Sequence, residues 1–378
     1  MQAALSYKPT VQFAGLDVLR CCAALAIVFY HATLGYTALP KAALLLLHNL
    51  PVGVDFFFII SGFLITYLLL VEKSQRGAIS LPRFYLRRSL RIFPLYFGIV
   101  ALAWWLHAEA RPDISFRSYC YFGGNFWMIA RNDWTVATLN PLWSLCIEEQ
   151  FYLIIPLLLL LLPIKRLPWL FGGIIAFSIG FRAYATITMP YNWMTIYCHT
   201  LSRCDLLALG GGLAWWHFTQ PIRLRLPRWT LLVALAFLVL LLSVIDCSDY
   251  TSLNFATFKK YLYVLPLVFI FCFTLFNQAP VAENLAEDAT AAAATTTPNP
   301  GLAGLNYLGK ISYGLYMYHS PIIFLLDTHP AVYDGKPLLR MLLIVGLTIA
   351  TAALSYEAFE KQILRLKGRF EVVRTARA

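Results

Sequence analysis

The sequence predicts an all-α fold: a polytopic integral membrane bundle of about ten transmembrane helices with both termini in the cytoplasm. Of the 378 residues, 60% are apolar and only 13% are charged, whereas a soluble domain carries about 25% charged residues. The apolar residues also gather in runs close to the ~20 residues that a helix needs to cross a bilayer. Basic residues fall in short segments between those runs.

Ten apolar runs are predicted to span the membrane, and together they form one predicted domain over residues 1–378. The shortest run is also rich in glycine. The predicted spans are 16–36, 52–71, 92–108, 148–163, 168–188, 205–218, 229–246, 261–277, 309–327 and 337–358.

The distribution of Lys and Arg predicts the orientation. Four basic segments, 72–91, 165–166, 223–228 and 361–378, fall on the same side of a ten-span chain. Cytoplasmic loops carry an excess of Lys and Arg, so that side is predicted to be the cytoplasm. The outer segment 109–147 carries three arginines and is a mild exception. The net charge of +11 therefore indicates contact with anionic lipid headgroups of the bilayer rather than with nucleic acid.

Two segments are expected to lie outside the spans on the cytoplasmic side. Residues 279–306 are small, polar and proline-bearing, which is typical of a flexible loop. Residues 361–378 form a basic tail. The eight cysteines show no C-x-x-C spacing, so no metal site is predicted. Cys120, Cys198 and Cys247 fall in or near outer loops, which leaves a disulfide there as an open alternative.

The first span carries two ionisable residues, Arg20 and His31. Eleven residues make just over three helical turns, so both side chains share one face about 16 Å apart. An ionisable residue in a spanning helix is expected to face a protein interior or a water-filled cavity. The structural alternative is a snorkelling Arg at the helix end and a His in a helix–helix contact.

Acidic residues open two other spans at the outer side, where His31 is also expected. Asp55 begins the second span, and Glu148 and Glu149 begin the fourth. A carboxylate beside an imidazole fixes its tautomer and raises its basicity, so Asp55 or Glu148 is predicted to orient His31. The alternative is that these acids only complement helix dipoles. Arg203 and Asp205 open the sixth span and are expected to pair with each other.

A basic cluster precedes the third span. Arg87 and Arg91 lie four residues apart on a predicted short helix, with Arg88 beside them. Three guanidinium groups make a good phosphate clamp, although ordinary positive-inside charge explains them equally well. The remaining polar candidates for substrate binding or for donating to an oxyanion lie near these acids or in the ninth span. They are Ser61, Trp143, Ser144, Glu149, Tyr152, Arg203, Asp205, Tyr313, Tyr316 and His319.

Five features in this order resemble the membrane-bound acyltransferase-3 family of O-acyltransferases. They are the Arg20-x10-His31 spacing and the segments GVDFFFIISGFLIT, RRSLRIFP, PLWSLCIEEQFYLIIP and LGKISYGLYMYHSPI. The resemblance reaches from Asp17 to Glu360. Its one departure is Gln362, where many members have a proline, and this weakens only the role of Glu360. We expect no extracytoplasmic SGNH hydrolase-like domain of the kind that some members carry, so the membrane domain or a separate partner is expected to complete the transfer.

The resemblance implies a function. Members move a small acyl group, usually acetyl, from acyl-CoA to a hydroxyl of a cell-envelope glycan or similar acceptor. The essential Arg and His of the family correspond to Arg20 and His31. The family motifs GxDxFFxxSG, RRxxRxxP and WSLxxE correspond here to Gly53, Asp55, Phe57, Phe58, Ser61, Gly62, Arg87, Arg88, Arg91, Pro94, Trp143, Ser144, Leu145 and Glu148.

The resulting hypothesis is an acyl-CoA-dependent O-acyltransferase of the bacterial cytoplasmic (inner) membrane. Acyl-CoA, most simply acetyl-CoA, binds from the cytoplasm with its phosphates on Arg87, Arg88 and Arg91. His31 acts as general base on the acceptor hydroxyl, or as a transient acyl carrier. Arg20, Asp55 and Glu148 complete the predicted catalytic set. The rival hypothesis is a proton-coupled transporter or flippase of a glycan or lipid, because such carriers also hold ionisable residues in the membrane.

Overall fold

The computed structural model describes residues 10, 11, 13, 15–247, 252, 253, 257, 259–277, 300–333, 335–367, 370, 374 and 375. Within them the chain is helical, apart from one pair of two-residue strands. The ten longest elements are α1 (Leu16–Ala32), α3 (Val52–Arg76), α4 (Leu81–His107), α7 (Leu142–Leu161), α8 (Leu167–Thr188), α10 (Thr200–Thr219), α11 (Arg228–Val244), α12 (Lys260–Phe276), α15 (Ser312–Asp327) and α16 (Pro337–Ser355). The shorter ones are α2 (Lys41–His48), α5 (Phe116–Cys120), α6 (Gly124–Arg131), α9 (Trp193–Cys198), α14 (Pro300–Lys310), α17 (Lys361–Lys367), β1 (Thr10–Val11) and β2 (Arg374–Thr375).

Each predicted span coincides with one of the ten long helices, so the all-α, many-helix prediction is confirmed. Among the described residues, five helical stretches are long and apolar enough to cross a membrane. They are Lys41–Arg76, Leu81–His107, Leu142–Leu161, Ile164–Thr188 and Pro337–Leu366. Helices α11 and α12 are also apolar but shorter. The number of crossings and their orientation stay predictions.

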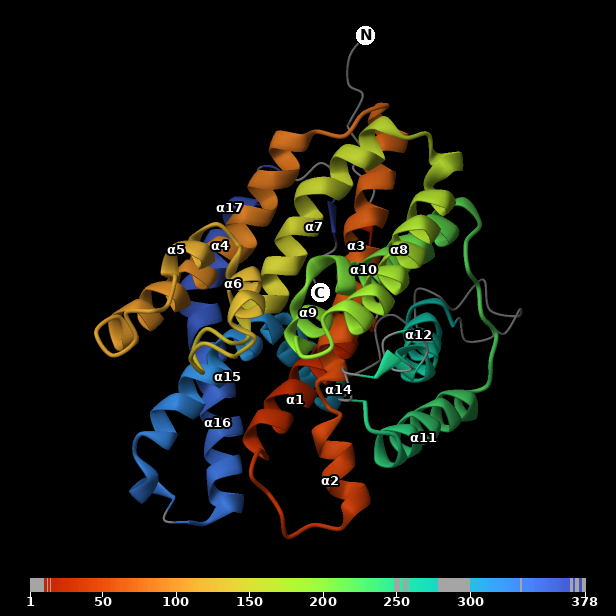
Figure 1. Cartoon of the computed structure of the whole chain (residues 1–378). Coiled ribbons are helices and arrows are strands. Elements are labelled where there is room, and N and C mark those ends of the chain that lie inside the picture. The colour runs from red at the N-terminus through yellow and green to blue at the C-terminus, as the bar shows by residue number, and fades with distance from the viewer. Residues whose placement is uncertain are drawn as a thin grey trace.

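Figure 1 shows how the helices are arranged. Helices α1 and α3 lie in the middle, with α4, α15 and α16 on one side and α11 and α12 on the other. Helix α3 packs most extensively against α10. A Cβ on Gly62 would lie 2.0 Å from the Leu207 carbonyl oxygen, and one on Gly210 would lie 2.1 Å from that of Ile59. Only glycine permits this approach, as small residues do in membrane helix pairs generally.

Several helix boundaries differ from the predictions by four residues or more, and three of the differences change the interpretation of a segment. Helix α4 begins at Leu81 rather than at 92, with a proline in its first turn, so the basic cluster belongs to a long helix. Helix α7 begins at Leu142 rather than at 148. Residues 300–306, predicted as loop, lie in α14, while the rest of the predicted loop 279–306 falls outside the described residues. The proline in the first turn of α4 fits there because its missing N–H is not needed at a helix N-terminus.

The basic segment 72–91 is therefore mostly helical, and one of its residues caps another helix. The Lys73 ammonium donates to the carbonyl oxygens of Leu159 (2.6 Å), Leu160 (3.1 Å) and Leu162 (2.7 Å). These carbonyls lie at the C-terminal end of α7, where helix oxygens lack partners and a cation is favoured. Lys73 thereby joins the ends of α3 and α7.

The short strands near the two ends of the chain pair with each other. Strands β1 and β2 pair in parallel, with Thr10 opposite Arg374. Nearby, Arg87 bonds to the buried carboxylate of Glu72 (3.3 Å) and to the carbonyl of Phe370 (3.0 Å). Strands β1 and β2 therefore lie on the same side of the bundle.

The sequence left two questions open: whether the cysteines form a disulfide, and how the arginines of segment 109–147 are accommodated. All eight cysteines are free thiols, so the alternative of an outer disulfide is wrong. Two of the outer-loop arginines, Arg111 and Arg131, both pair with Asp113 at 3.0 and 2.5 Å. Hydrogen bonds from Arg111, with those from Arg131, lower the pKa of Asp113 to about 2. The carboxylate therefore offsets part of the positive charge that made this loop an exception.

A buried ion network ties three helices together and corrects the predicted Arg203–Asp205 pair. The Asp205 carboxylate of α10 accepts from Arg182 of α8 (2.9 Å) and from Lys260 of α12 (2.9 Å). Tyr261 donates to the same carboxylate at 2.7 Å. Helix geometry turns Arg203, two residues earlier, toward a different side of α10, so these neighbours cannot meet. The two cations around Asp205 are almost fully buried.

We expect Asp205→Asn to lower the free energy of unfolding by about 3–5 kcal/mol, because it leaves two buried cations without their carboxylate. The matched control is Asp327→Asn. Asp327 also pairs with an arginine, Arg340, at 3.0 Å, but it is 45% exposed, so the expected cost is about 0–1 kcal/mol. Unfolding of the purified proteins in one detergent measures both. Equal losses in the two variants would contradict a structural role for the buried network.

Candidate active site

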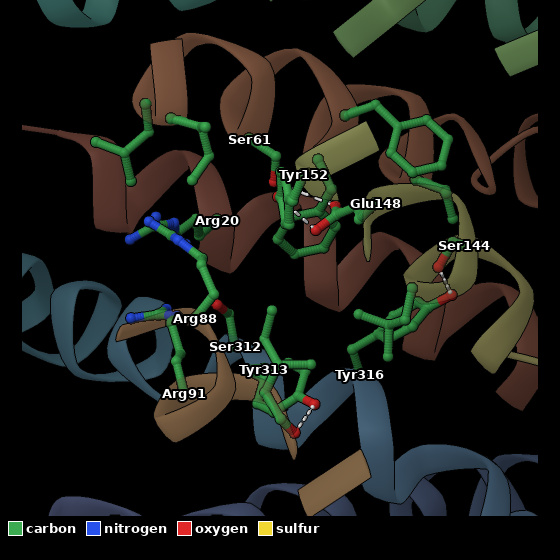
Figure 2. A pocket seen from close by; sticks show the side chains of 17 residues that line it. Arg20, Ser61, Arg88, Arg91, Ser144, Glu148, Tyr152, Ser312, Tyr313 and Tyr316 are labelled. Atoms are coloured by element: carbon green, nitrogen blue, oxygen red, sulfur yellow. Dashed lines mark hydrogen bonds between the residues drawn. The ribbon is translucent and has the colours of Figure 1, made fainter. Parts of the chain in front are cut away.

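A cavity of about 90 Å³ lies among α1, α3, α4, α7 and α15. Figure 2 shows its side chains, with the guanidinium groups gathered on one side and the carboxylate on the other. Its polar lining residues are Arg20, Ser61, Arg88, Arg91, Ser144, Glu148, Tyr152, Ser312, Tyr313 and Tyr316. It thus brings together residues from four of the five sequence features that were singled out above, together with Arg20 of the fifth.

The cationic wall consists of Arg20, Arg88 and Arg91. Arg20 is held by Asp17 one turn earlier, at 3.4 Å. The guanidinium carbon of Arg88 lies 5.7 Å from the centre of the Tyr152 ring, within the range of a cation–π contact. The predicted trio was Arg87, Arg88 and Arg91. The structure replaces Arg87 with Arg20, because Arg87 faces Glu72 instead.

The opposite wall carries the carboxylate of Glu148. Ser61 donates to one of its oxygens at 3.1 Å and Tyr152 donates to the other at 2.8 Å. Among the described lining residues, it is the one acid facing three guanidinium groups. The cavity therefore carries excess positive charge and suits an anion. One oxygen of the adjacent Glu149 is buried without a hydrogen-bond partner in the described part of the chain, and Glu149 does not line the cavity.

Two tyrosines of α15 line the cavity with their hydroxyl protons already engaged. Tyr313 donates to the carbonyl of Ile92 at 2.9 Å, and Tyr316 donates to that of Pro141 at 2.7 Å. Ser144 lies 2.7 Å from the Tyr316 hydroxyl. Ser144 also lies 3.3 Å from the same Pro141 carbonyl, so the two hydroxyl protons are both used within this group, whichever hydroxyl donates to the other. Neither tyrosine has a spare proton for an oxyanion in this arrangement.

His31 lies beyond the cavity wall, next to His319. The two imidazole ring centres are 4.8 Å apart. His31 is partly buried, and its Nδ1 lies 3.0 Å from the carbonyl oxygen of Ile27. His319 is fully buried, with Nδ1 2.6 Å from the carbonyl oxygen of Tyr316. This pairing could not be predicted from the sequence, because the depth of α15 relative to α1 cannot be read from either helix alone.

Asp55 and Glu148 do not orient His31, contrary to prediction. The buried carboxylate of Asp55 forms an ion pair with Arg203 of α10 and accepts from Tyr263 of α12 at 2.7 Å. Arg203 also lies over the ring of Trp143, at 5.4 Å, so Trp143 supports that pair and does not line the cavity. Asp55 lies in the first turn of its helix, as predicted, but its partner comes from α10.

A second opening lies on the far side of His31. It is a groove of about 320 Å³ between the end of α1 and α2. Its lining residues are Tyr30, Thr33, Leu34, Gly35, Tyr36, Lys41, Leu44, Leu45, Leu47 and His48. No role was predicted for these residues from the sequence. The tyrosines Tyr30 and Tyr36 and the histidine His48 are residue types that are common in membrane helices, so they gave no specific signal.

A row of five side-chain rings leads from the groove to the cavity, and we call it the file of rings. Its members are His48, Tyr30, His31, His319 and Tyr316. Ring centres are 6.1 Å apart for His48 and Tyr30, and 4.8 Å for Tyr30 and His31. They are 4.8 Å apart for His31 and His319, and 5.7 Å for His319 and Tyr316. Tyr316 lines the cationic cavity. The histidine pair therefore stands between two openings, one cationic and one largely apolar. The described residues contain no cluster of three His, Cys, Asp or Glu side chains able to hold a metal ion.

These features define a helical membrane protein with an internal cavity lined by three arginines and with a histidine pair beside it. Within that class, the chain belongs to the acyltransferase-3 family, because the family model described as an acyltransferase domain matches residues 13–357. The resemblance read from the motifs is thereby confirmed.

Named relatives are similar over most of this chain. A Staphylococcus aureus (strain COL) protein with a provisional O-acetyltransferase name is 30% identical over 94% of this chain and 58% of its own length. The peptidoglycan O-acetyltransferase OatA of Listeria monocytogenes is 28% identical over 92% of this chain and 55% of its own. The O-acetyltransferase OatA of Staphylococcus aureus (strain NCTC 8325) is 28% identical over 94% and 57%. The chain thus spans a little over half the length of these relatives. No solved structure matches it.

Proposed function

We propose that this protein transfers a small acyl group, most simply acetyl, from cytoplasmic acyl-CoA to a hydroxyl of a cell-envelope or exported glycan, in the bacterial cytoplasmic membrane. The observation that carries the proposal is the file of rings between the cationic cavity and the outer groove. The names of the relatives support acetyl as the acyl group and a glycan as the acceptor.

The cationic cavity is the proposed donor site. Acyl-CoA carries phosphates, and guanidinium groups bind phosphate oxygens through charge-assisted, often bidentate hydrogen bonds. Arg20 lies in the second turn of α1, while Arg88 and Arg91 lie in the first part of α4. Strand β1 ends shortly before α1 begins, and Arg87 in the first part of α4 contacts the Phe370 carbonyl near β2, so these helix ends lie near the paired strands. The phosphates therefore enter from the side predicted to be cytoplasmic.

His31 is the proposed general base. A carbonyl oxygen can only accept a hydrogen bond, so the contact with Ile27 assigns the proton of a neutral His31 to Nδ1. Nε2 then carries a lone pair. It takes the proton of the acceptor hydroxyl as that oxygen attacks the thioester carbonyl, and the imidazolium returns a proton to the leaving thiolate. The acyl-His variant uses the same nitrogen as nucleophile. The outer groove admits the acceptor, with Tyr30 and His48 offering ring faces to a sugar.

The file of titratable rings also supports the rival function, a proton-coupled transporter or flippase, because such carriers use histidines and acids inside the membrane. Membership of an acyltransferase family weighs against it. The two functions differ in one requirement: a carrier moves its cargo without consuming acyl-CoA.

For the donor site, we expect Arg88→Ala to raise the KM for acetyl-CoA by about tenfold or more, because it removes a charge-assisted contact. The control is Arg87→Ala, one residue away, whose side chain faces Glu72. It is expected to leave the KM unchanged. Steady-state rates with varied acetyl-CoA measure both constants. If the two variants behave alike, the arginines serve only the orientation of the chain.

For the base, we expect His31→Ala to lower turnover by about 10²- to 10⁴-fold at saturating donor and acceptor. Folding is checked by the size-exclusion profile. His217→Ala is the control, because His217 stacks on Phe276 at 4.3 Å, away from the ring file. It is expected to keep turnover per folded molecule. A folded His31→Ala protein that retains more than about a tenth of wild-type turnover would rule out both the general-base and the acyl-His roles.

A further inference from the structure

His319 presents a bare acceptor atom deep inside the protein. Its Nδ1 lies 2.6 Å from the Tyr316 carbonyl oxygen, and a carbonyl can only accept, so we assign the ring proton to Nδ1. Nε2 therefore carries a lone pair. This atom is buried and has no hydrogen-bond partner among the described residues. An unpaired buried polar atom costs free energy, and its presence in a native structure calls for an explanation.

His31 repeats the arrangement beside it. Its Nδ1 is engaged by the carbonyl of Ile27, one turn earlier on its own helix. No other hydrogen bond of its ring is found within the described part of the chain. Since the ring centres of His31 and His319 are 4.8 Å apart, two lone-pair nitrogens are available to one small ligand. Each histidine is fixed in this tautomer by its own helix, independently of the other.

An acceptor that satisfies both nitrogens through hydroxyl groups must bring two of them close together. One hydroxyl has one proton and serves one nitrogen. We propose that the His31–His319 pair selects acceptors with two adjacent hydroxyl groups, the vicinal diol that sugars carry, and that His319 is the residue that recognises the second hydroxyl. This inference rests on the proposed acyl transfer and names the chemical class of its acceptor.

The two hydroxyls have different fates. The one that donates to His31 Nε2 loses its proton to that nitrogen, and its oxygen forms the ester bond as the carbon–sulfur bond of the thioester breaks. The thiolate recovers the proton from His31. The second hydroxyl donates to His319 Nε2 and keeps its proton throughout. The product is the monoester of the diol plus free CoA, and His319 is unchanged.

The test compares acceptors that differ by one hydroxyl. The purified full chain receives acetyl-CoA together with methyl glucoside, methyl mannoside or methyl galactoside, or with the monodeoxy derivatives that lack a hydroxyl next to the acylated one. We expect wild-type kcat/KM to fall by about tenfold or more when that neighbour is missing, because a buried acceptor is then left unpaired. In His319→Phe, the parent sugar and the deoxy sugar are expected to react at similar rates.

Two conservative variants separate recognition from a structural role. His319→Gln places an amide near the position of Nε2 and can supply an acceptor there. His319→Asn places an amide near Nδ1 and can restore only the contact with the Tyr316 carbonyl. We expect Gln, and not Asn, to restore the preference for the parent sugar. His107→Phe is the matched control, because His107 is also a buried histidine whose Nε2 has no partner among the described residues, and its ring packs on Phe324 rather than in the file. It is expected to leave the preference unchanged.

Several outcomes would overturn the inference. Wild-type protein that acylates parent and deoxy sugars equally well contradicts it, whether or not any His319 variant folds. A His319→Phe protein that is slower with both sugars to the same extent makes His319 a proton-sharing partner of His31 instead. Rescue by Asn but not by Gln makes it structural. A wild-type protein that acylates no sugar while transport of a glycan proceeds counts against the proposed function itself.

Discussion

Ionisable side chains inside a bilayer must find partners, and much of this structure satisfies that constraint. Asp205 gathers Arg182 and Lys260 from two other helices, and Asp55 meets Arg203. These buried pairs join α3, α8, α10 and α12 into one unit. Against that neutralised background, the cavity around Glu148 keeps three guanidinium groups for one carboxylate. Such an excess of buried charge is costly unless an anion binds, so the cavity is where a charged ligand belongs.

Uncharged polar groups inside the bundle also need hydrogen-bond partners. Tyr313, Tyr316 and Ser144 all donate to partners within the protein, so they hold the cavity wall in place. His31 and His319 donate their Nδ1 protons to backbone carbonyls, and Nε2 of His319 has no hydrogen-bond partner among the described residues. These three hydroxyl groups are thus bonded within the protein, while the histidine pair stands between the cationic cavity and the groove at the end of α1.

The spans could be predicted from sequence because apolar runs and basic segments are local signals. The family could be predicted because five motifs occur in a fixed order. The partners of the ionisable side chains were harder to predict, because they depend on the rotation of each helix about its axis and on its depth in the bundle. Arg203 and Asp205 are neighbours in the chain, yet they face different helices. Arg87 and Arg88 differ by one residue and about 100° of helix, which separates a structural ion pair from the cavity wall. The contact between His319 and His31 depends on the packing of α15 beside α1, which neither helix sequence reveals alone.

The central claim is that one chain carries an acyl group from a cationic donor site on the side of the termini to an acceptor at the opposite groove. Vesicles with the protein in one orientation test it directly, with acetyl-CoA enclosed on the side of the termini and a membrane-impermeant glycan on the other. The account predicts an acylated glycan from this arrangement and none when the two compartments are exchanged. Acylation only when donor and acceptor share a compartment would contradict it.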